Sequence, residues 1–221
     1  CLCVEGNRLT RIIAEEIGVD FKEVGELIVA FNQSDIADLE RLKQEAESFG
    51  VPRLALVDSA WLREHEPNLS EDVVAALYAP TAGIISPYRW VYDFAENAQR
   101  NGVSVFTSHC VKGVVHNESD GNFTIVTNRQ EFRSRYVINA AGLYADDIAR
   151  MLGINDIVIR PRKGQEFLLD KKKENLTNHL IFPLPTKTSK GVLVIKTSDG
   201  NPMIGPTAEE VSDKEDFSTD Q

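Results

Sequence analysis

The stretch RYVINAAGLYADDIARMLG, residues 135–153, holds the pattern that decides the fold. An apolar run, Tyr136-Val137-Ile138, leads into Asn139-Ala140-Ala141-Gly142, and a helical pattern follows at once. This order predicts a strand that ends in small residues and opens a helix over 143–152. Small side chains let another group approach the backbone closely, and the first N–H groups of a helix favour an anion such as a pyrophosphate. Tight packing of helix on strand, with no ligand, is equally compatible with this spacing.

The residues around this junction alternate between helical and strand patterns. Helices are expected over 3–17, over 34–50 with Ser34 as the cap, from an Asp58 cap up to Pro67, and over 87–102. A meander of three strands, 109–117, 122–128 and 131–140, precedes the small-residue turn. The remaining strands are expected at 25–31, 53–58, 73–80, 103–106, 165–170, 179–185, 191–197 and 201–207. The class is therefore a mixed α/β (α+β) fold.

The composition limits the classes of function. The 221 residues carry a net charge of −10. Residues 209–221 hold six acidic side chains and one lysine, which is half of that charge, so a solvated acidic tail is expected there. The rest of the chain is only mildly acidic, which argues against nucleic acid as the partner. No apolar run approaches the ~18–20 residues that a membrane span needs.

The cysteines and the chain start indicate the context of the protein. Cys1, Cys3 and Cys110 give no disulfide framework, which predicts a reducing, cytoplasmic location. No second Cys/His pair completes a tetrahedral site with Cys1 and Cys3, so no metal is expected. The chain lacks an initiator Met and a signal-peptide pattern, and it is expected to be a piece of a longer protein.

One hallmark of a dinucleotide site is missing. Such sites have a G-x-G-x-x-G turn after a strand. None of the 14 glycines belongs to a G-x-G. On the residues alone, either the chain binds no dinucleotide or that turn lies outside this sequence.

Further motifs accompany VINAAG (137–142) along the chain. They are CVEGNRL (3–9), GELIVAF (25–31), EPNL (66–69), APTAGIISPY (79–88), PRKGQEFLLDK (161–171), NHLIFPLPT (178–186) and GNPMIGPTAE (200–209). In this order they resemble the FAD-dependent oxidoreductases of the D-amino-acid-oxidase type. Within that family they are most similar to bacterial glycerol-3-phosphate dehydrogenase-like proteins and L-2-hydroxyglutarate oxidase. The resemblance covers nearly all of residues 1–208.

The resemblance implies two domains. Residues 1–17 and 81–152 would form part of an FAD-binding domain, a small antiparallel meander plus helices. Residues 18–80 and 153–208 would form a substrate domain built on an antiparallel sheet. The family's N-terminal glycine-rich FAD turn and its C-terminal part would lie outside this sequence, so the piece alone is expected to be inactive and to bind FAD poorly. Strand edges left free by the missing neighbours favour a homodimer.

The resemblance also implies FAD-contacting residues. The backbone of Val111 would meet the adenine. Ala140, Ala141 and Gly142 would form a second contact with the cofactor. Ile85 and Ser86 would lie near the isoalloxazine ring.

The implied reaction is the oxidation of a small anionic secondary alcohol, glycerol 3-phosphate or L-2-hydroxyglutarate, with hydride transfer to the flavin. His179 begins an apolar strand and is a candidate to take the alcohol proton, although a strand-end histidine more often bonds to backbone. Gln165 would lie near the substrate, where related proteins often have Glu. Arg162 is the favoured cation for the anionic group, ahead of Arg160, Lys163, Lys187 and Lys190.

The sequence does not indicate the electron acceptor, which could be oxygen, a quinone or a carrier protein. Peripheral attachment to the inner face of the membrane is compatible with the sequence.

A non-catalytic binding module derived from the same fold is the alternative class of function. Such a module would be expected to lose Gly142 or to gain bulk at Ala140 or Ala141, so their presence favours the enzyme.

Overall fold

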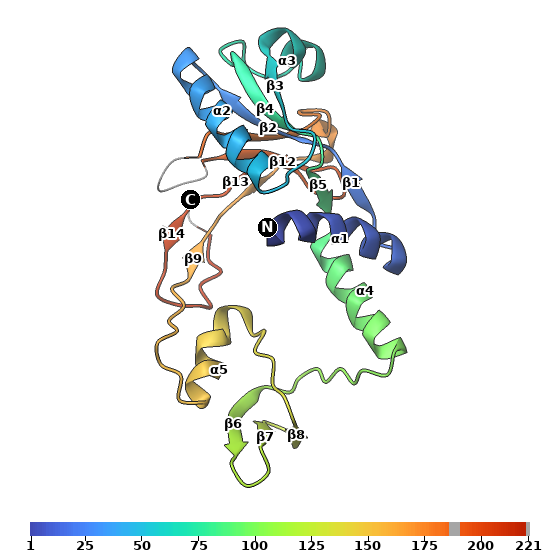
Figure 1. Cartoon of the computed structure of the whole chain (residues 1–221), viewed down its shortest axis with the longest axis vertical. Helices are drawn as coiled ribbons and strands as arrows, with labels where there is room; N and C mark the ends of the chain where they lie inside the picture. Colours follow the sequence, from blue (N-terminus) through green and yellow to red (C-terminus); the bar gives the residue numbers. More distant parts are fainter. Residues whose placement is uncertain (186–190, 220–221) are drawn as a thin grey trace. The chain divides into compact units, whose positions relative to one another are not determined.

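The chain forms two compact units, each built from separate segments. The computed structural model describes residues 1–185 and 191–219. The first unit comprises Cys1–Val103 with Gly164–Ala208, and the second comprises Ser104–Lys163 with Glu209–Gln221 (Figure 1). The mixed α/β class is confirmed. The boundaries of these units differ from those of the two predicted domains, and that functional division stays a prediction.

A seven-stranded sheet forms the centre of the first unit. Neighbouring strands are antiparallel except β2 and β11, which run parallel with Leu180 opposite Glu26. The sheet is antiparallel, as expected, at every other pair, and the parallel pair forms where β11 reaches β2 from a distant segment of the chain. In spatial order the strands are β10 (Phe167–Leu168), β13 (Pro202–Gly205), β12 (Leu193–Lys196), β11 (Leu180–Pro183), β2 (Glu26–Ala30), β4 (Ala75–Ala79) and β3 (Ala55–Asp58).

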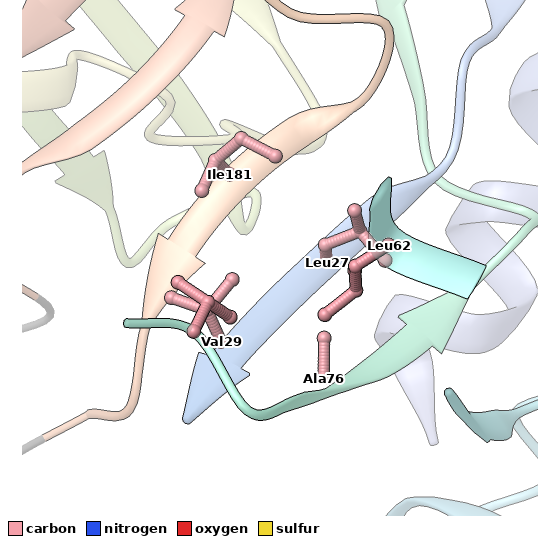
Figure 2. Close-up of a cluster of buried hydrophobic side chains, with 6 residues drawn as sticks. Leu27, Val29, Leu62, Ala76 and Ile181 are labelled. Carbon is pink, nitrogen blue, oxygen red and sulfur yellow. The ribbon is translucent and has the colours of Figure 1, made fainter. Parts of the chain in front are cut away.

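The centre of this sheet is buried on both faces because its apolar side chains alternate. Leu27 and Val29 of β2 belong to one core cluster, whereas Ala30 belongs to the other. Helix α3 (Ser59–His65) contributes Leu62 to the first cluster, and α2 (Gln33–Ser48) contributes Leu39 to the second. Figure 2 shows the first cluster, with side chains of β2, β4, β11 and α3 pointing toward one another. Each fully buried Leu or Val stabilises the unit by about 1.5–3 kcal/mol.

The remaining elements of the first unit lie close to their expected positions. Helix α1 (Leu2–Ile17) begins one residue earlier than predicted, and α4 (Pro87–Arg100) has Pro87 in its first turn, as predicted. A short pair that the pattern does not signal joins β1 (Phe21–Glu23) to β5 (Gly83–Ile85). The turn η2 (Lys171–Lys173) follows β10.

The cap of α2 differs from the prediction. Asn32, not Ser34, is the N-cap, and its Oδ1 accepts the N–H of Asp35 at 3.1 Å. Ser34 lies inside the first turn and donates its hydroxyl to the same Oδ1 at 2.5 Å. Both residue types are good caps, and the preceding strand sets where the helix begins.

The second unit contains the predicted meander. Its strands are β6 (Val111–Asn117), β7 (Asn122–Thr127) and β8 (Glu131–Ser134). Helix α5 (Ala145–Met151) packs against β6, so Ala149 and Val114 are both buried. A two-residue pair, β9 (Arg162–Lys163) with β14 (Glu209–Glu210), completes the unit.

One predicted strand is absent from the described residues, and the strand predicted at 131–140 is shorter than expected. Residues 103–106 form no strand, and β8 ends at Ser134, so the apolar run at 136–138 is unpaired as well. Val105 is 42% exposed and Ile138 is 91% exposed. Backbone pairing requires a neighbouring strand, and the described part of the chain places none beside either segment.

The acidic tail is largely exposed, as expected, and two of its parts are bonded to the rest of the second unit. Glu209 and Glu210 pair with β9, and Lys214 is bonded to two carboxylates of α5. The carboxylates of Asp146 and Asp147 on α5 bind Lys214 of the tail. The composition of the tail alone does not predict this ion pairing.

Candidate cofactor-binding turn and polar sites

The turn Asn139-Ala140-Ala141-Gly142 is exposed and is held by the side chain of its first residue. Asn139 Nδ2 donates to the carbonyl of Ala145 at 2.8 Å, and Asn139 Oδ1 accepts the N–H of Ala141 at 3.3 Å. Gly142 has φ +56°, which favours glycine, yet a Cβ there would meet nothing within 4 Å. Contact with the described residues therefore does not explain the glycine at 142, and the turn leaves room for a ligand there.

The helix after the turn begins more gradually than predicted. A 3₁₀ turn, η1 (Gly142–Tyr144), precedes α5. The first turn of α5 carries Asp146 and Asp147, and the N–H of Asp147 already bonds to Asp146 Oδ1 at 3.0 Å. An anionic ligand would thus be received by the turn rather than by the first N–H groups of α5.

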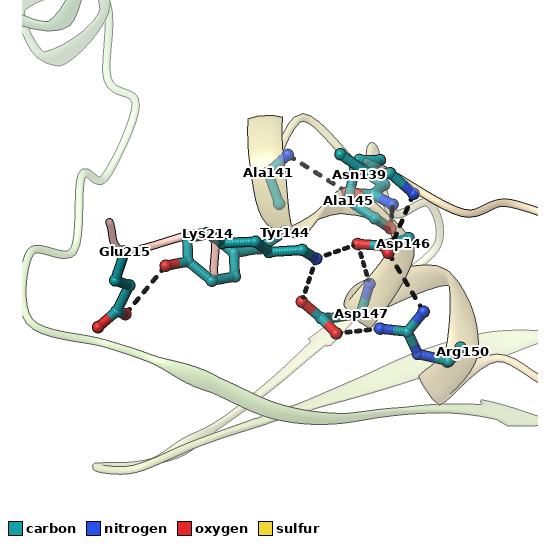
Figure 3. A network of polar contacts seen from close by, with 10 residues as sticks. Asn139, Ala141, Tyr144, Ala145, Asp146, Asp147, Arg150, Lys214 and Glu215 are labelled. Atoms are coloured by element: carbon teal, nitrogen blue, oxygen red, sulfur yellow. Dashed lines mark hydrogen bonds and ion pairs between the residues drawn. The ribbon is translucent and has the colours of Figure 1, made fainter. Parts of the chain in front are cut away.

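These two carboxylates form an ion network with the tail, shown in Figure 3. Lys214 Nζ donates to Asp146 Oδ1 at 2.6 Å and to Asp147 Oδ2 at 2.9 Å. Arg150 bonds to both carboxylates from one turn further along α5. The Tyr144 hydroxyl donates to Glu215 Oε1 at 2.9 Å, which adds a second link to the tail.

The pKa values of three charged groups in this network are shifted from their ordinary values. The hydrogen bond from Lys214 holds the pKa of Asp146 far below its usual range and also lowers the pKa of Asp147. The same bonds raise the pKa of Lys214. Asp146 is 3% exposed, and the N–H of Ile159 gives it a further bond at 3.2 Å. The network is therefore charged and tightly bonded across the ordinary pH range.

The predicted adenine contact lies in the same unit as the turn. Val111 begins β6, opposite Thr127, and the ladder has a bulge between Val111 and Gly113. Because α5 packs on β6, the helix that follows the turn lies beside this strand.

Ile85 and Ser86 lie in the first unit. Ile85 pairs with Phe21, and Ser86 caps α4. Ser86 also lines a polar cleft of about 560 Å³ together with Gly18, Val19, Asp20, Lys22, Arg89, Ser198 and Asp199. Lys22 Nζ in this cleft donates to the carbonyl of Ser198 at 2.8 Å.

His179 is paired with a buried carboxylate. Its Nδ1 lies 2.7 Å from Glu66 Oε1, and its backbone N–H donates to the same atom at 2.5 Å. Glu66 is 2% exposed and also accepts the N–H of Asn178 at 2.8 and 3.0 Å. The imidazole meets the ring of Tyr78 edge-on at 5.3 Å and lies 5.8 Å from Trp61. The side chain of His179 therefore bonds to a carboxylate, and not to the backbone as strand-end histidines more often do. This bond fixes the orientation of the ring.

The other predicted substrate residues are more open. The backbone N–H of Gln165 donates to Thr207 Oγ1 at 2.9 Å, and Thr207 returns a backbone bond to Gln165. Arg162 is exposed on β9, whereas Lys163 is close to Asp216 at 3.4 Å and Glu209 at 3.8 Å. Lys163 is therefore the less available cation. Lys187 and Lys190 lie outside the described residues.

The predicted site residues fall into the two units. Val111, Ala140, Ala141, Gly142 and Arg162 belong to the second, and Ile85, Ser86, Gln165 and His179 belong to the first. Sequence reasoning missed Glu66 and Lys214. Glu66 pairs with residues 112 and 113 positions away, so a single sequence carries no signal for it. Lys214 does leave a signal, because it is the one lysine among the six acidic residues of the tail.

The described residues hold neither a metal-binding cluster nor a membrane-crossing helix. Residues 1–185 and 191–219 include no cluster of three or more His, Cys, Asp or Glu side chains that would hold a metal ion. The same residues include no helix that is both long and apolar enough to cross a membrane.

The chain belongs to the FAD dependent oxidoreductase family, whose profile matches residues 1–221. It is 40% identical over 218 residues to a glycerol 3-phosphate dehydrogenase of Caloramator mitchellensis, covering 99% of this chain and 45% of that protein. It is 33% identical to the human mitochondrial L-2-hydroxyglutarate dehydrogenase, covering 94% of this chain and 47% of that enzyme. The chain thus spans about half the length of the curated relatives it matches.

Solved structures agree with this assignment. L-α-glycerophosphate oxidase from Mycoplasma pneumoniae, solved with FAD bound, superposes with a TM-score of 0.85 at 28% identity. The match covers 96% of this chain and 56% of that one. The L-proline dehydrogenase from P. horikoshii gives the same TM-score at 25% identity, over 98% and 57% of the two chains. The predicted family and the predicted FAD-linked reductase type of fold are therefore confirmed.

The second unit fits a dinucleotide at its turn. The exposed backbone of residues 139–142, the open space at Gly142 and the small side chains before it suit the close approach of a flat, charged group. We therefore treat this turn as the candidate FAD contact of the chain.

Proposed function

We propose that the whole protein oxidises a small anionic secondary alcohol, with glycerol 3-phosphate as the first candidate. The observation that carries this proposal is the 40% identity, over 99% of the chain, to a glycerol 3-phosphate dehydrogenase. L-2-hydroxyglutarate is the second candidate, supported by the 33% identity to the human enzyme. Both compounds have a carbinol carbon near an anionic group.

FAD, when bound, supplies the acceptor for the hydride that leaves the carbinol carbon. The chain's own groups would manage the anion and the proton. Arg162, exposed on β9, binds the anionic group of the substrate. Gln165 orients the substrate through its side-chain amide.

His179 takes the alcohol proton in this proposal. Glu66 holds Nδ1 at 2.7 Å, which leaves Nε2 as the nitrogen that accepts. The carboxylate stabilises the imidazolium that results, as carboxylates do beside catalytic histidines. The alternative role for His179 is to complete the Glu66 cluster as a structural residue.

The test uses the full-length natural protein. It is purified, its visible absorbance is recorded for flavin bands, and glycerol 3-phosphate or L-2-hydroxyglutarate is added without oxygen. Bleaching by one of them supports the proposal and selects the substrate. A flavin that neither compound bleaches contradicts both substrates. A protein that binds no flavin even after FAD is added favours a non-catalytic binding module.

Two variants assign roles in the same assay. Arg162→Met is expected to raise KM for the anionic alcohol about tenfold or more with a smaller change in kcat. His179→Asn is expected to keep the flavin spectrum and to slow bleaching by about 100-fold, the range of general-base effects. A His179→Asn protein that is unstable but bleaches at the normal rate would assign His179 the structural role.

We also propose a homodimer and a reducing location. Edge strand β10 exposes Phe167 and Leu168, at 74% and 62%, so it offers an apolar edge for pairing between copies. All three cysteines are free and exposed, which suits a compartment such as the cytoplasm. Light scattering that gives a single-copy mass at high concentration would rule out the dimer.

A further inference from the structure

The tail of the second unit is bonded to the helix that follows the candidate FAD turn. Lys214 lies between the two acidic side chains of the first turn of α5, at 2.6 Å from Asp146 and 2.9 Å from Asp147. Its Nζ also lies 5.4 Å from the centre of the Tyr144 ring, which belongs to η1. Figure 3 shows the lysine reaching both carboxylates from the tail segment.

Hydrogen bonds link the turn to the start of this helix. The side-chain amide of Asn139 donates to the carbonyl of Ala145, the first residue of α5, and the N–H of Tyr144 in η1 donates to the carbonyl of Ala141 at 3.0 Å. A displacement of the first turn of α5 would therefore break the bonds that shape residues 139–142.

The charge balance makes Lys214 important for that first turn. Asp146 and Asp147 are adjacent, and Asp146 is 3% exposed. Arg150 of α5 contacts both carboxylates but brings one positive charge for two negative ones. Lys214 supplies the second positive charge, with a side chain that is only 18% exposed. The other titratable groups of the tail that face this region, Asp213 and Glu215, are acidic and add no compensation.

We propose that Lys214 is a positioning residue for FAD binding, because it fixes the first turn of α5 and, through Asn139, the shape of the turn at residues 139–142. This inference rests on the proposed contact between that turn and FAD. Without Lys214 the two carboxylates repel each other and an approaching anion, and the turn loses order that FAD binding would have to restore.

The test measures the dissociation constant for FAD by flavin fluorescence in the apo form of the full-length protein. Lys214→Met is expected to raise this constant by about 3- to 30-fold, the usual range for changes within a coupled network. Lys214→Arg keeps the charge and the reach, so it is expected to restore most of the affinity. Lys172→Met removes an equivalent charge from the exposed turn η2 of the first unit and serves as the control.

A second measurement separates positioning from simple charge. Hydrogen exchange at the amides of Ala141 and Tyr144, without FAD, is expected to be faster in Lys214→Met and normal in Lys172→Met. If Lys214→Met does not fold, Asp147→Asn removes one partner of the lysine and is expected to give a smaller loss of FAD affinity in the same direction.

The outcomes distinguish the two proposals. A wild-type protein that binds no FAD overturns the proposed function. A wild-type protein that binds FAD, with Lys214→Met and Asp147→Asn binding it equally well, overturns the positioning role alone. Equal weakening by Lys214→Met and Lys172→Met would also overturn it, since only net charge would then matter.

Discussion

At the scale of single residues, Glu66 is a buried polar side chain held by several hydrogen bonds. It is buried at the end of α3, and its partners are two backbone N–H groups and the His179 imidazole. A buried carboxylate is stable only when its bonds are complete, because its desolvation is costly. Glu66 therefore ties α3 to the start of β11.

Replacing Glu66 tests this link. Glu66→Gln puts an NH₂ group against N–H donors and is expected to lower the free energy of unfolding by about 2–4 kcal/mol. Urea denaturation measures the change. Glu64→Gln, on the exposed side of the same helix, is the matched control and should change stability by less than about 0.5 kcal/mol. Equal effects of the two variants would contradict the link.

Gly25 gives a second test at this scale. It has φ +75°, and a Cβ there would lie 2.7 Å from Tyr78 Cε2 and 2.9 Å from His179 Cδ2. Gly25→Ala is expected to cost about 2–4 kcal/mol, from backbone strain plus the displacement of both rings. Gly18→Ala has φ +79° but no atom within 4 Å of the new Cβ, so it should cost only about 1 kcal/mol. Thermal melting measures both variants. The loss in Gly18→Ala reports backbone strain alone, and the additional loss in Gly25→Ala reports the crowding of the two rings.

The candidate site residues could be nominated from local sequence features, whereas their distant partners could not. His179 directly precedes β11, as its pattern predicted, and the small residues at 140–142 precede a helix but do not follow a strand. Glu66 and Lys214 act on residues far along the chain, at separations of 113 and 68 positions. A single sequence has no local pattern for such pairs.

At the scale of elements, the helices and the central strands followed the periodic patterns. The strand predicted at 103–106 is absent, and the strand predicted at 131–140 stops at Ser134, because pairing depends on a neighbouring strand. The parallel register of β2 with β11 was missed for the same reason. Local propensity indicates which residues can adopt an extended backbone. Which of these segments then pair depends on the order of strands in the folded sheet.

The start of α2 is a test for this scale. Asn32→Ala removes the cap and the acceptor of the Ser34 hydroxyl, so it is expected to destabilise the protein by about 1 kcal/mol. Ser34→Ala, at the cap position that the sequence predicted, should cost less than about 0.5 kcal/mol. Chemical denaturation of the pair decides between the two caps, and a larger loss for Ser34→Ala would contradict the structure.

At the scale of the whole molecule, the tail gives stability a dependence on pH. The folded-state pKa values of Asp146 and Asp147 are below their ordinary value of about 3.9, so their contribution is present above that pH and is lost as pH falls through the folded values. The folded-state pKa of Lys214 is above its ordinary value of about 10.4, so its contribution is complete below that pH and is lost as pH rises through the folded value.

Melting temperatures of the wild type and of Lys214→Met, measured from acid to alkaline pH, test this dependence. The difference between them is expected to be largest from about pH 5 to 9 and to shrink outside that range. Lys172→Met should track the wild type throughout. A constant difference at every pH would mean that Lys214 acts through packing of its methylene groups rather than through its charge.

The parallel pairing of β2 with β11 also bears on how the chain is made. Residues 26–30 leave the ribosome long before residues 180–183, and β11 is the strand that separates β2 from β12 in the finished sheet. Until then β2 has an open, apolar edge that invites pairing with other nascent chains. Such distant contacts slow folding because the long intervening loop must close first. The sheet of the first unit is therefore complete only after residues 180–183 have been synthesised.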